Sequence, residues 1–476
     1  MIEKSHDGYA QKFLFCIVGF LCFSAYMSIF FPGYITADTI LILRMGTGID
    51  ILSNWHPPFL SYIWGAIYEL FQNVAFIWMV QILLFIGFGY VWAKRLAIYP
   101  IGLLALASIV LWPSVMTNMG AIWKDCWTIV ATLATVAFAR QAWETQTLTP
   151  IVLSIIAAVT ATLFRIDYAV VVLPVVLALG FHLANMRRIK RAAFGVGIAF
   201  VAFFGGMFLV KGAFDLSVRK ELNPWLPIAI WDIAGAQIQD GAEIKSLKVA
   251  HMRLAADLYN CRTSDPLVFG VGGTALNLPE TPIIRPRAEE AKDISSLWLR
   301  TIQEHPLGYV KHRGCVLRQF LGLGVKTLHY PYPFGIPTPS EFGHNFVRTK
   351  NNISAYFFFD RNANGPFWRY WIYLAVVSVI GIGLIIMKTR WNMRTRGGFV
   401  LVIVLTVFAA ASRGMVLPAA DFRYGLWIAI GTLIAAFETL DLVAAHFLRR
   451  QGVPFRPVVV QTALAEVSDA ERTRAE

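Results

Sequence analysis

Eight polar residues, in or beside apolar stretches, are of the types that transfer a group from a phosphate-linked donor. They are Asp38, His56, Lys124, Asp125, Arg165, Asp167, Arg423 and Tyr424. A carboxylate accepts the proton of an attacking hydroxyl group. Lys and Arg bind a phosphate leaving group, Arg through paired hydrogen bonds. The set therefore contains a general base and a phosphate site, if the fold brings its members together.

Each residue also has a purely structural explanation. Asp38 is placed to cap the helix that follows it, and His56 precedes two prolines, where it can end a loop and bond to the backbone. Lys124-Asp125 and Arg165-Asp167 are spaced to form local ion pairs. Arg423 beside a tyrosine resembles an anchor at a membrane interface. These explanations do not predict that all the residues share one side of the membrane.

The composition is that of a membrane protein that crosses the bilayer several times. Of 476 residues, 57% are hydrophobic and only 15% are charged, where soluble domains carry about 25% charged residues. Apolar runs near the length that spans a hydrocarbon core recur along the chain. The net charge of +13 is explained by Lys and Arg at cytoplasmic ends of helices, and we expect no nucleic-acid partner.

The sequence predicts about ten transmembrane helices. Their ranges are 13–31, 73–93, 98–116, 125–140, 148–164, 167–186, 192–211, 367–387, 398–417 and 424–447. Basic clusters at 187–191, 388–396 and 449–450 place both termini in the cytoplasm, and the expected location is a bacterial inner membrane. In this topology all eight polar residues lie on the non-cytoplasmic side.

Residues 57–71 are the ambiguous stretch, because they are apolar enough for a short crossing. A crossing would place Lys94 and Arg95 outside, against the charge rule. We therefore expect a helix that lies in, or dips into, the outer interface.

These spans divide the chain into four parts. Residues 1–211 form a transmembrane core with catalytic outer loops, 212–366 an extracytoplasmic domain of mixed structure, 367–447 the last transmembrane helices, and 448–476 a cytoplasmic tail. A helical segment over 294–321 is broken at His305-Pro306. Cys261 and Cys315 fall in the extracytoplasmic domain, where oxidation is permitted, and are candidates for a disulfide.

The chain resembles the GT-C superfamily of membrane glycosyltransferases, which includes protein O-mannosyltransferases and the lipid A aminoarabinose transferase. The resemblance rests on Asp38 in the first outer loop, the His56-Pro57-Pro58 element, Asp125 at the start of a span, and Arg423-Tyr424 near the last span. It covers roughly the first 210 residues. Mannosyltransferases carry an acidic pair where this chain has Asp38-Thr39, so acceptor handling differs.

The resemblance implies a polyprenyl-phosphate-linked sugar as donor and a lipid or glycan of the cell envelope as acceptor. It implies that Asp38 is the general base, that Asp125 assists, and that Lys124, Arg165 and Arg423 bind the donor phosphate. A divalent cation, Mg²⁺ or Mn²⁺, stays an open cofactor, because two acids alone do not establish one. The alternatives are another envelope polymerase, ligase or acyltransferase, or a flippase for the lipid-linked sugar.

Overall fold

The computed structural model describes residues 3–187, 192–242, 259–269, 288–325, 342, 365–387 and 396–451. Most of the basic clusters at 187–191 and 388–396, and the tail from residue 452, lie outside the described residues.

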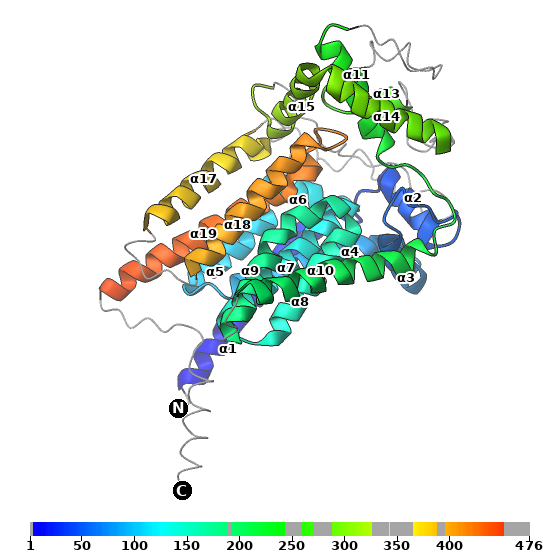
Figure 1. Ribbon diagram of the computed structural model, residues 1–476. Coiled ribbons are helices and arrows are strands. Elements are labelled where there is room, and N and C mark those ends of the chain that lie inside the picture. The colour runs from blue at the N-terminus through cyan, green and yellow to red at the C-terminus, as the bar shows by residue number, and fades with distance from the viewer. Residues whose placement is uncertain are drawn as a thin grey trace.

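The chain is an all-helical membrane protein with many spans, and the described residues contain no named strand (Figure 1). The first half comprises α1 (Glu3–Phe30), α2 (Ala37–Gly46), α3 (Pro58–Phe71), α4 (Ala75–Ala93), α5 (Tyr99–Leu111), α6 (Pro113–Met119), α7 (Lys124–Thr145), α8 (Leu148–Phe164), η1 (Ile166–Tyr168), α9 (Ala169–Met186) and α10 (Ala192–Asp215). The second half comprises α11 (Leu226–Gln239), α13 (Asp265–Phe269), α14 (Ala288–Glu304), α15 (Pro306–Leu321), η5 (Pro366–Trp368), α17 (Tyr370–Met387), α18 (Arg396–Ser412), η6 (Arg413–Met415), η7 (Phe422–Gly425) and α19 (Leu426–Arg450).

All ten predicted spans coincide with helices. Six helical stretches are long and apolar enough to cross a membrane by themselves, and α5 with α6 forms a seventh candidate that bends by 55°. The bend is at Trp112-Pro113, where a proline begins the second helix. Helices α8 and α17 are apolar but shorter. Helix α7 has 22 residues, but charged residues near both of its ends lower its hydropathy.

Helix α3 begins and ends at the same end of the bundle. At its start, Lys124 Nζ lies 3.2 Å from His56 Nδ1. Just after its end, Trp78 Nε1 in the first turn of α4 donates to the carbonyl oxygen of Met119 at 3.0 Å. Residues 119 and 124 are joined by a short loop. The segment 57–71 therefore does not cross the bundle, as the charge rule predicted.

The described part of the segment 212–366 is helical, where mixed structure was expected. Helices α11, α13, α14 and α15 gather at one end of the bundle, at the top of Figure 1. The predicted break is present, since α14 ends at Glu304 and α15 begins at Pro306. Both helices pack on α11. The structure contains a disulfide between Cys261 and Cys315, with Cα atoms 5.8 Å apart.

A buried polar network joins α4, α5, α7 and α19 away from this end. Arg140 Nε donates to Glu438 Oε1 at 2.8 Å, and Trp92 Nε1 donates to the same oxygen at 3.0 Å. The Asp441 carboxylate accepts from the backbone N–H groups of Ala97 and Ile98, at 2.9 and 2.7 Å. These N–H groups precede α5, so Asp441 satisfies donors that the helix itself leaves unpaired.

Candidate active site

Two loops that are distant in the sequence, one before α2 and one before α7, are joined by hydrogen bonds beside the site. Tyr34 N donates to Gly120 O at 2.8 Å, and Ile122 N donates to Tyr34 O at 2.9 Å. The Thr39 hydroxyl donates to Ile122 O at 2.6 Å. These bonds hold the first turn of α2, which carries Asp38, beside the first turn of α7.

Asp38 does not cap α2. The N-cap is Thr36, whose side chain accepts from Thr39 N, while the Thr39 side chain accepts from Thr36 N. The α2 helix lies so close against α3 that a Cβ atom added to Gly46 or Gly65 would collide with the backbone of the other helix. The Asp38 carboxylate, with 26% of the side chain exposed, is thus free for other contacts.

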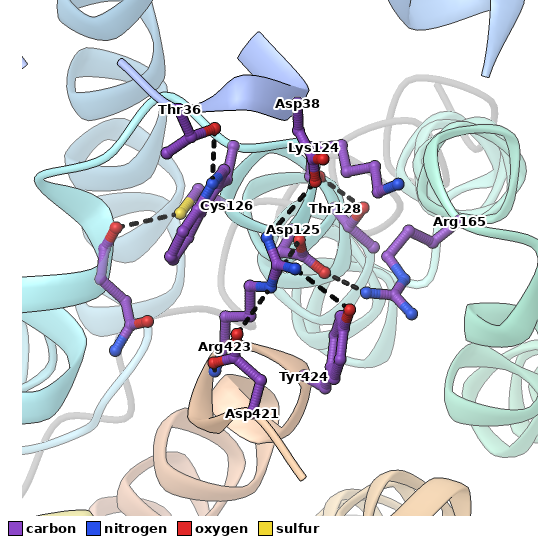
Figure 2. A network of polar contacts seen from close by, with 12 residues as sticks. Thr36, Asp38, Lys124, Asp125, Cys126, Thr128, Arg165, Asp421, Arg423 and Tyr424 are labelled. Atoms are coloured by element: carbon purple, nitrogen blue, oxygen red, sulfur yellow. Dashed lines mark hydrogen bonds and ion pairs between the residues drawn. The ribbon is translucent and has the colours of Figure 1, made fainter. Parts of the chain in front are cut away.

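The main partner of Asp38 is Arg423, from the other end of the sequence. Arg423 Nη1 donates to Asp38 Oδ2 at 3.3 Å, and Nη2 donates to the Tyr424 hydroxyl at 3.1 Å. Arg423 Nε lies 3.1 Å from Asp421 Oδ2 and 4.0 Å from Asp125 Oδ2. Figure 2 shows this guanidinium between the carboxylates. Arg423 therefore connects several residues of the site, a role here called a hub, and is not an interface anchor.

Arg165 is a second hub. Its Nε and Nη2 donate to the two oxygens of Asp167 at 3.0 and 2.9 Å, so the predicted local ion pair exists. Its Nη1 also donates to Asp125, which is only 1% exposed. The guanidinium lies 4.5 Å from the centre of the Tyr424 ring. A local pair alone would not join α7, η1 and η7 as this residue does.

Lys124 differs from the arginines, because it forms no ion pair with a carboxylate in the described part of the chain. Its partner is His56, whose Nδ1 lies 3.2 Å from Lys124 Nζ. An ammonium group only donates, so Nδ1 must accept and Nε2 must carry the imidazole proton. That Nε2 is buried without a hydrogen-bond partner, 4.0 Å from Asp38 Oδ1.

The neighbouring charges determine the protonation of Asp38 and His56. Burial alone would raise the pKa of Asp38, but the cations of Lys124 and Arg423 outweigh it and hold that pKa well below its ordinary value. Burial, and then the Lys124 ammonium, lower the pKa of His56 to about 3. At neutral pH, Asp38 is therefore a carboxylate and His56 is a neutral imidazole.

A cavity of about 450 Å³ adjoins the site. Lys124, Arg165 and Asp167 are among its polar wall residues, and its apolar walls include Phe59 and Phe214. The rings of Phe59 and Phe214 are in contact, with centroids 5.2 Å apart. The cavity thus combines charged side chains of both signs with largely apolar walls from α3, α8 and α10.

All eight predicted residues belong to this contact network, and the structure adds three more. Arg413 donates through Nε to Asp167 Oδ2 at 2.8 Å and through Nη1 to Tyr424 O at 3.1 Å. Asp421 pairs with Arg423, and the Trp123 ring lies 4.7 Å from the Arg423 guanidinium carbon. Arg413 falls inside the predicted span 398–417, and a cation at membrane depth is itself a signal of function.

The carboxylates are not arranged as a metal site. The described residues contain no group of three or more His, Cys, Asp or Glu side chains that would hold a metal ion. Arg423 already lies between Asp38 and Asp125, within 3.3 and 4.0 Å of them. A divalent cation there would face this guanidinium, so the residues present do not fit one.

Comparison with known proteins identifies no family. No protein-family model and no curated protein matches the chain. Among solved structures, the chain is similar to ArnT from Cupriavidus metallidurans bound to undecaprenyl phosphate. The TM-score is 0.30 at 15% identity, and the match covers 92% of this chain and 79% of that one. A TM-score of this size does not establish a shared fold.

Proposed function

We propose that the chain is a glycosyltransferase that moves a sugar from a polyprenyl-phosphate donor to a hydroxyl group of a cell-envelope lipid or polysaccharide. The reaction would occur on the non-cytoplasmic side of a bacterial inner membrane. The observation that carries the proposal is the position of Lys124. Its ammonium group forms no ion pair with a carboxylate of the described residues, and Lys124 lines a largely apolar cavity together with Arg165.

The cavity suits a donor that is anionic at one end and apolar at the other. A phosphate at the polar end would meet Lys124 and the guanidinium of Arg165, and charge-assisted hydrogen bonds to such groups are strong. The first units of a lipid chain would contact Phe59, Phe164 and Phe214. A water-soluble sugar nucleotide would leave these apolar walls unused.

The proposed chemistry is a displacement at the anomeric carbon. The acceptor oxygen attacks this carbon as its proton passes to the Asp38 carboxylate. The bond from the anomeric carbon to the phosphate oxygen breaks, and polyprenyl phosphate leaves with the bonding electrons. Lys124 and Arg165 stabilise the charge that develops on that oxygen, while Asp125 and Asp167 hold Arg165 in place.

Charge balance in the site links donor binding to the strength of the base. Four carboxylates, on Asp38, Asp125, Asp167 and Asp421, face four cations, on Lys124, Arg165, Arg413 and Arg423. In the free site these cations make Asp38 a weak base. A bound phosphate would offset part of the positive charge and raise the pKa of Asp38 towards values that favour proton transfer.

Transfer and lipid binding, measured separately on the purified chain in lipid nanodiscs, test the proposal. Asp38→Asn should slow sugar transfer by about 10²- to 10⁴-fold while polyprenyl monophosphate still binds. A polymerase, ligase or acyltransferase that depends on His56 would instead retain activity in Asp38→Asn and lose it in His56→Gln. A flippase would move the lipid-linked sugar across liposome membranes without transferring the sugar.

A further inference from the structure

Residues 413–425, here called the Arg423 segment, supply several side chains of the site. Arg413 holds Asp167, Asp421 and Tyr424 contact Arg423, and Arg423 contacts Asp38. The segment connects α18 to α19. The described part of residues 212–366, here called the extramembrane domain, contacts this segment. These contacts therefore bear on where the guanidinium groups of the site lie.

The extramembrane domain contacts the Arg423 segment at three points. The first is a backbone pairing, in which Ser264 N donates to Pro418 O at 3.0 Å and Ala420 N donates to Arg262 O at 2.6 Å. Arg313 Nη1, from α15, donates to Leu417 O at 3.0 Å. The third contact is between Gly414 and α15, where an added Cβ atom would lie 2.5 Å from Phe320 Cδ1.

Arg313 belongs to a buried cluster of polar side chains from α11, α14, α15 and the stretch before α13. Its Nε lies 2.6 Å from Asp232 Oδ1, and the other Asp232 oxygen accepts from Trp298 Nε1 at 3.0 Å. His312 Nε2 lies 3.2 Å from Asp232 Oδ1, and its Nδ1 lies 2.9 Å from the Tyr259 hydroxyl. Asp232, His312 and Arg313 are each at most 3% exposed. The guanidinium of Arg313 is therefore in ion-pair contact with a buried carboxylate through Nε, and its Nη1 donates to Leu417 O.

The disulfide joins the two elements that make these contacts. Cys261 immediately precedes the stretch that pairs with Pro418 and Ala420, and Cys315 lies two residues after Arg313 on α15. Loss of the bond would remove the covalent link between the 261–264 stretch and α15, and would leave the contact between Tyr259 and His312 to connect them.

We propose that Arg313 is a positioning residue for the site, acting through the Leu417 carbonyl on the Arg423 segment. The Cys261–Cys315 disulfide would support the same contact, and the two together are here called the brace. Arg313 and the disulfide would thus set the position of Arg423 without touching the substrate, since neither lines the cavity. The effect on lipid binding rests on the function proposed above, whereas the effect on the segment itself does not.

The test is a spin label at position 415 in the full chain, reconstituted in nanodiscs. Met415 is 50% exposed and does not line the cavity. Met415→Cys would carry a maleimide nitroxide in a Cys16→Ser background, since Cys16 is the exposed free cysteine among the described residues. A label at Leu405→Cys, 56% exposed on α18, reports changes that are not local. Polyprenyl monophosphate is the binding probe.

Arg313→Lys is the informative variant, because one ammonium group can keep the charge beside Asp232 but cannot also reach Leu417 O. It should keep the melting temperature near that of the wild type, increase label mobility at 415 and not at 405, and weaken binding of the probe about tenfold. Cys261→Ser/Cys315→Ser should increase mobility at 415 in the same way. If Arg313→Lys folds poorly, the double variant Asp232→Asn/Arg313→Gln replaces it in the test, because that variant leaves neither position charged.

Arg318→Ala is the matched control, since this exposed arginine of α15 bonds to Leu323 O and not to the Arg423 segment. It should change neither mobility nor binding. Unchanged mobility at 415 in the Arg313 and cysteine variants overturns the inference, whatever the wild-type chain binds. Increased mobility with unchanged affinity also overturns the positioning role. If the wild-type chain fails to bind the probe, the proposed function is wrong, and label mobility alone then decides whether the brace exists.

Discussion

The Arg423 guanidinium donates to the Asp38 carboxylate at 3.3 Å, although 385 residues separate them in the sequence. The contact joins η7, just before α19, to the first turn of α2. Because the same guanidinium approaches Asp421 and Asp125, it holds three acids around one point. Asp38 keeps part of its surface exposed in this arrangement and can meet an acceptor hydroxyl.

Replacement of Asp38 by Asn should lower the rate of sugar transfer by about 10²- to 10⁴-fold, the usual contribution of a general base. Affinity for polyprenyl monophosphate should hold or increase, because the substitution removes a negative charge beside Lys124 and Arg423. Transfer of a radiolabelled sugar measures the rate, and a binding titration with polyprenyl monophosphate measures the affinity. Asp50→Asn is the control, since Asp50 pairs with Arg44 away from the site. Equal losses in both variants would contradict a special role for Asp38.

Replacement of Lys124 by Met should weaken binding of polyprenyl monophosphate by about 10- to 100-fold, the equivalent of roughly 1.4 to 3 kcal/mol. The methionine keeps most of the side-chain volume and removes the cation that faces the cavity. Binding titrations in nanodiscs measure the change. Lys94→Met, at the far end of α4, should bind as the wild type does. A Lys124→Met chain with full affinity would place the phosphate elsewhere.

Acidification should destabilise the chain through His56. The folded pKa of about 3 is below the unfolded value of about 6.5, so the unfolded state binds more protons between these values. The contribution of His56 to the free energy of unfolding is therefore fully present above about pH 6.5. It decreases as the pH is lowered, by about 2 kcal/mol from pH 7 to pH 5. Melting temperatures across this range should fall more steeply for the wild type than for His56→Gln. Parallel curves would show that His56 titrates normally.

Disruption of the Arg140–Glu438 pair should destabilise the bundle more when one partner is removed than when both are. Each residue is 1% exposed, and removal of one partner of a buried ion pair costs about 3–5 kcal/mol. In Glu438→Leu the second partner of Arg140, Glu144 at 3.0 Å, offsets part of that cost. Glu438→Leu should therefore melt well below the wild type, and Arg140→Met/Glu438→Leu should recover much of the loss. A double variant no better than the single one would mean that the pair contributes little coupling.

Much of the fold could be predicted, because span length and charge asymmetry are local properties of a sequence. The ten helices and the uncrossed 57–71 segment followed from them. The bend at Pro113 and the helical character of the described part of residues 212–366 did not, since both depend on which faces pack together. Proline alone does not say whether a helix bends or ends.

The site was predicted as a set of residues but not as a network. The shared side of the membrane follows from topology, so Asp38, Lys124 and Arg423 could be grouped from the sequence. The partners could not be assigned, because the Arg423–Asp38 and Arg165–Asp125 contacts join loops whose packing the sequence does not encode locally. The role of Asp38 as a helix cap was wrong for a local reason, since Thr36 takes that position.

The most direct test uses purified chain in liposomes with a panel of polyprenyl-phosphate-linked sugars, an extract of envelope acceptors, and the release of polyprenyl monophosphate as the measured quantity. The proposed function predicts that wild-type chain releases it together with a glycosylated acceptor for at least one donor, and that Asp38→Asn releases neither. Equal release by wild type and Asp38→Asn, or release from none of the donors, would contradict it.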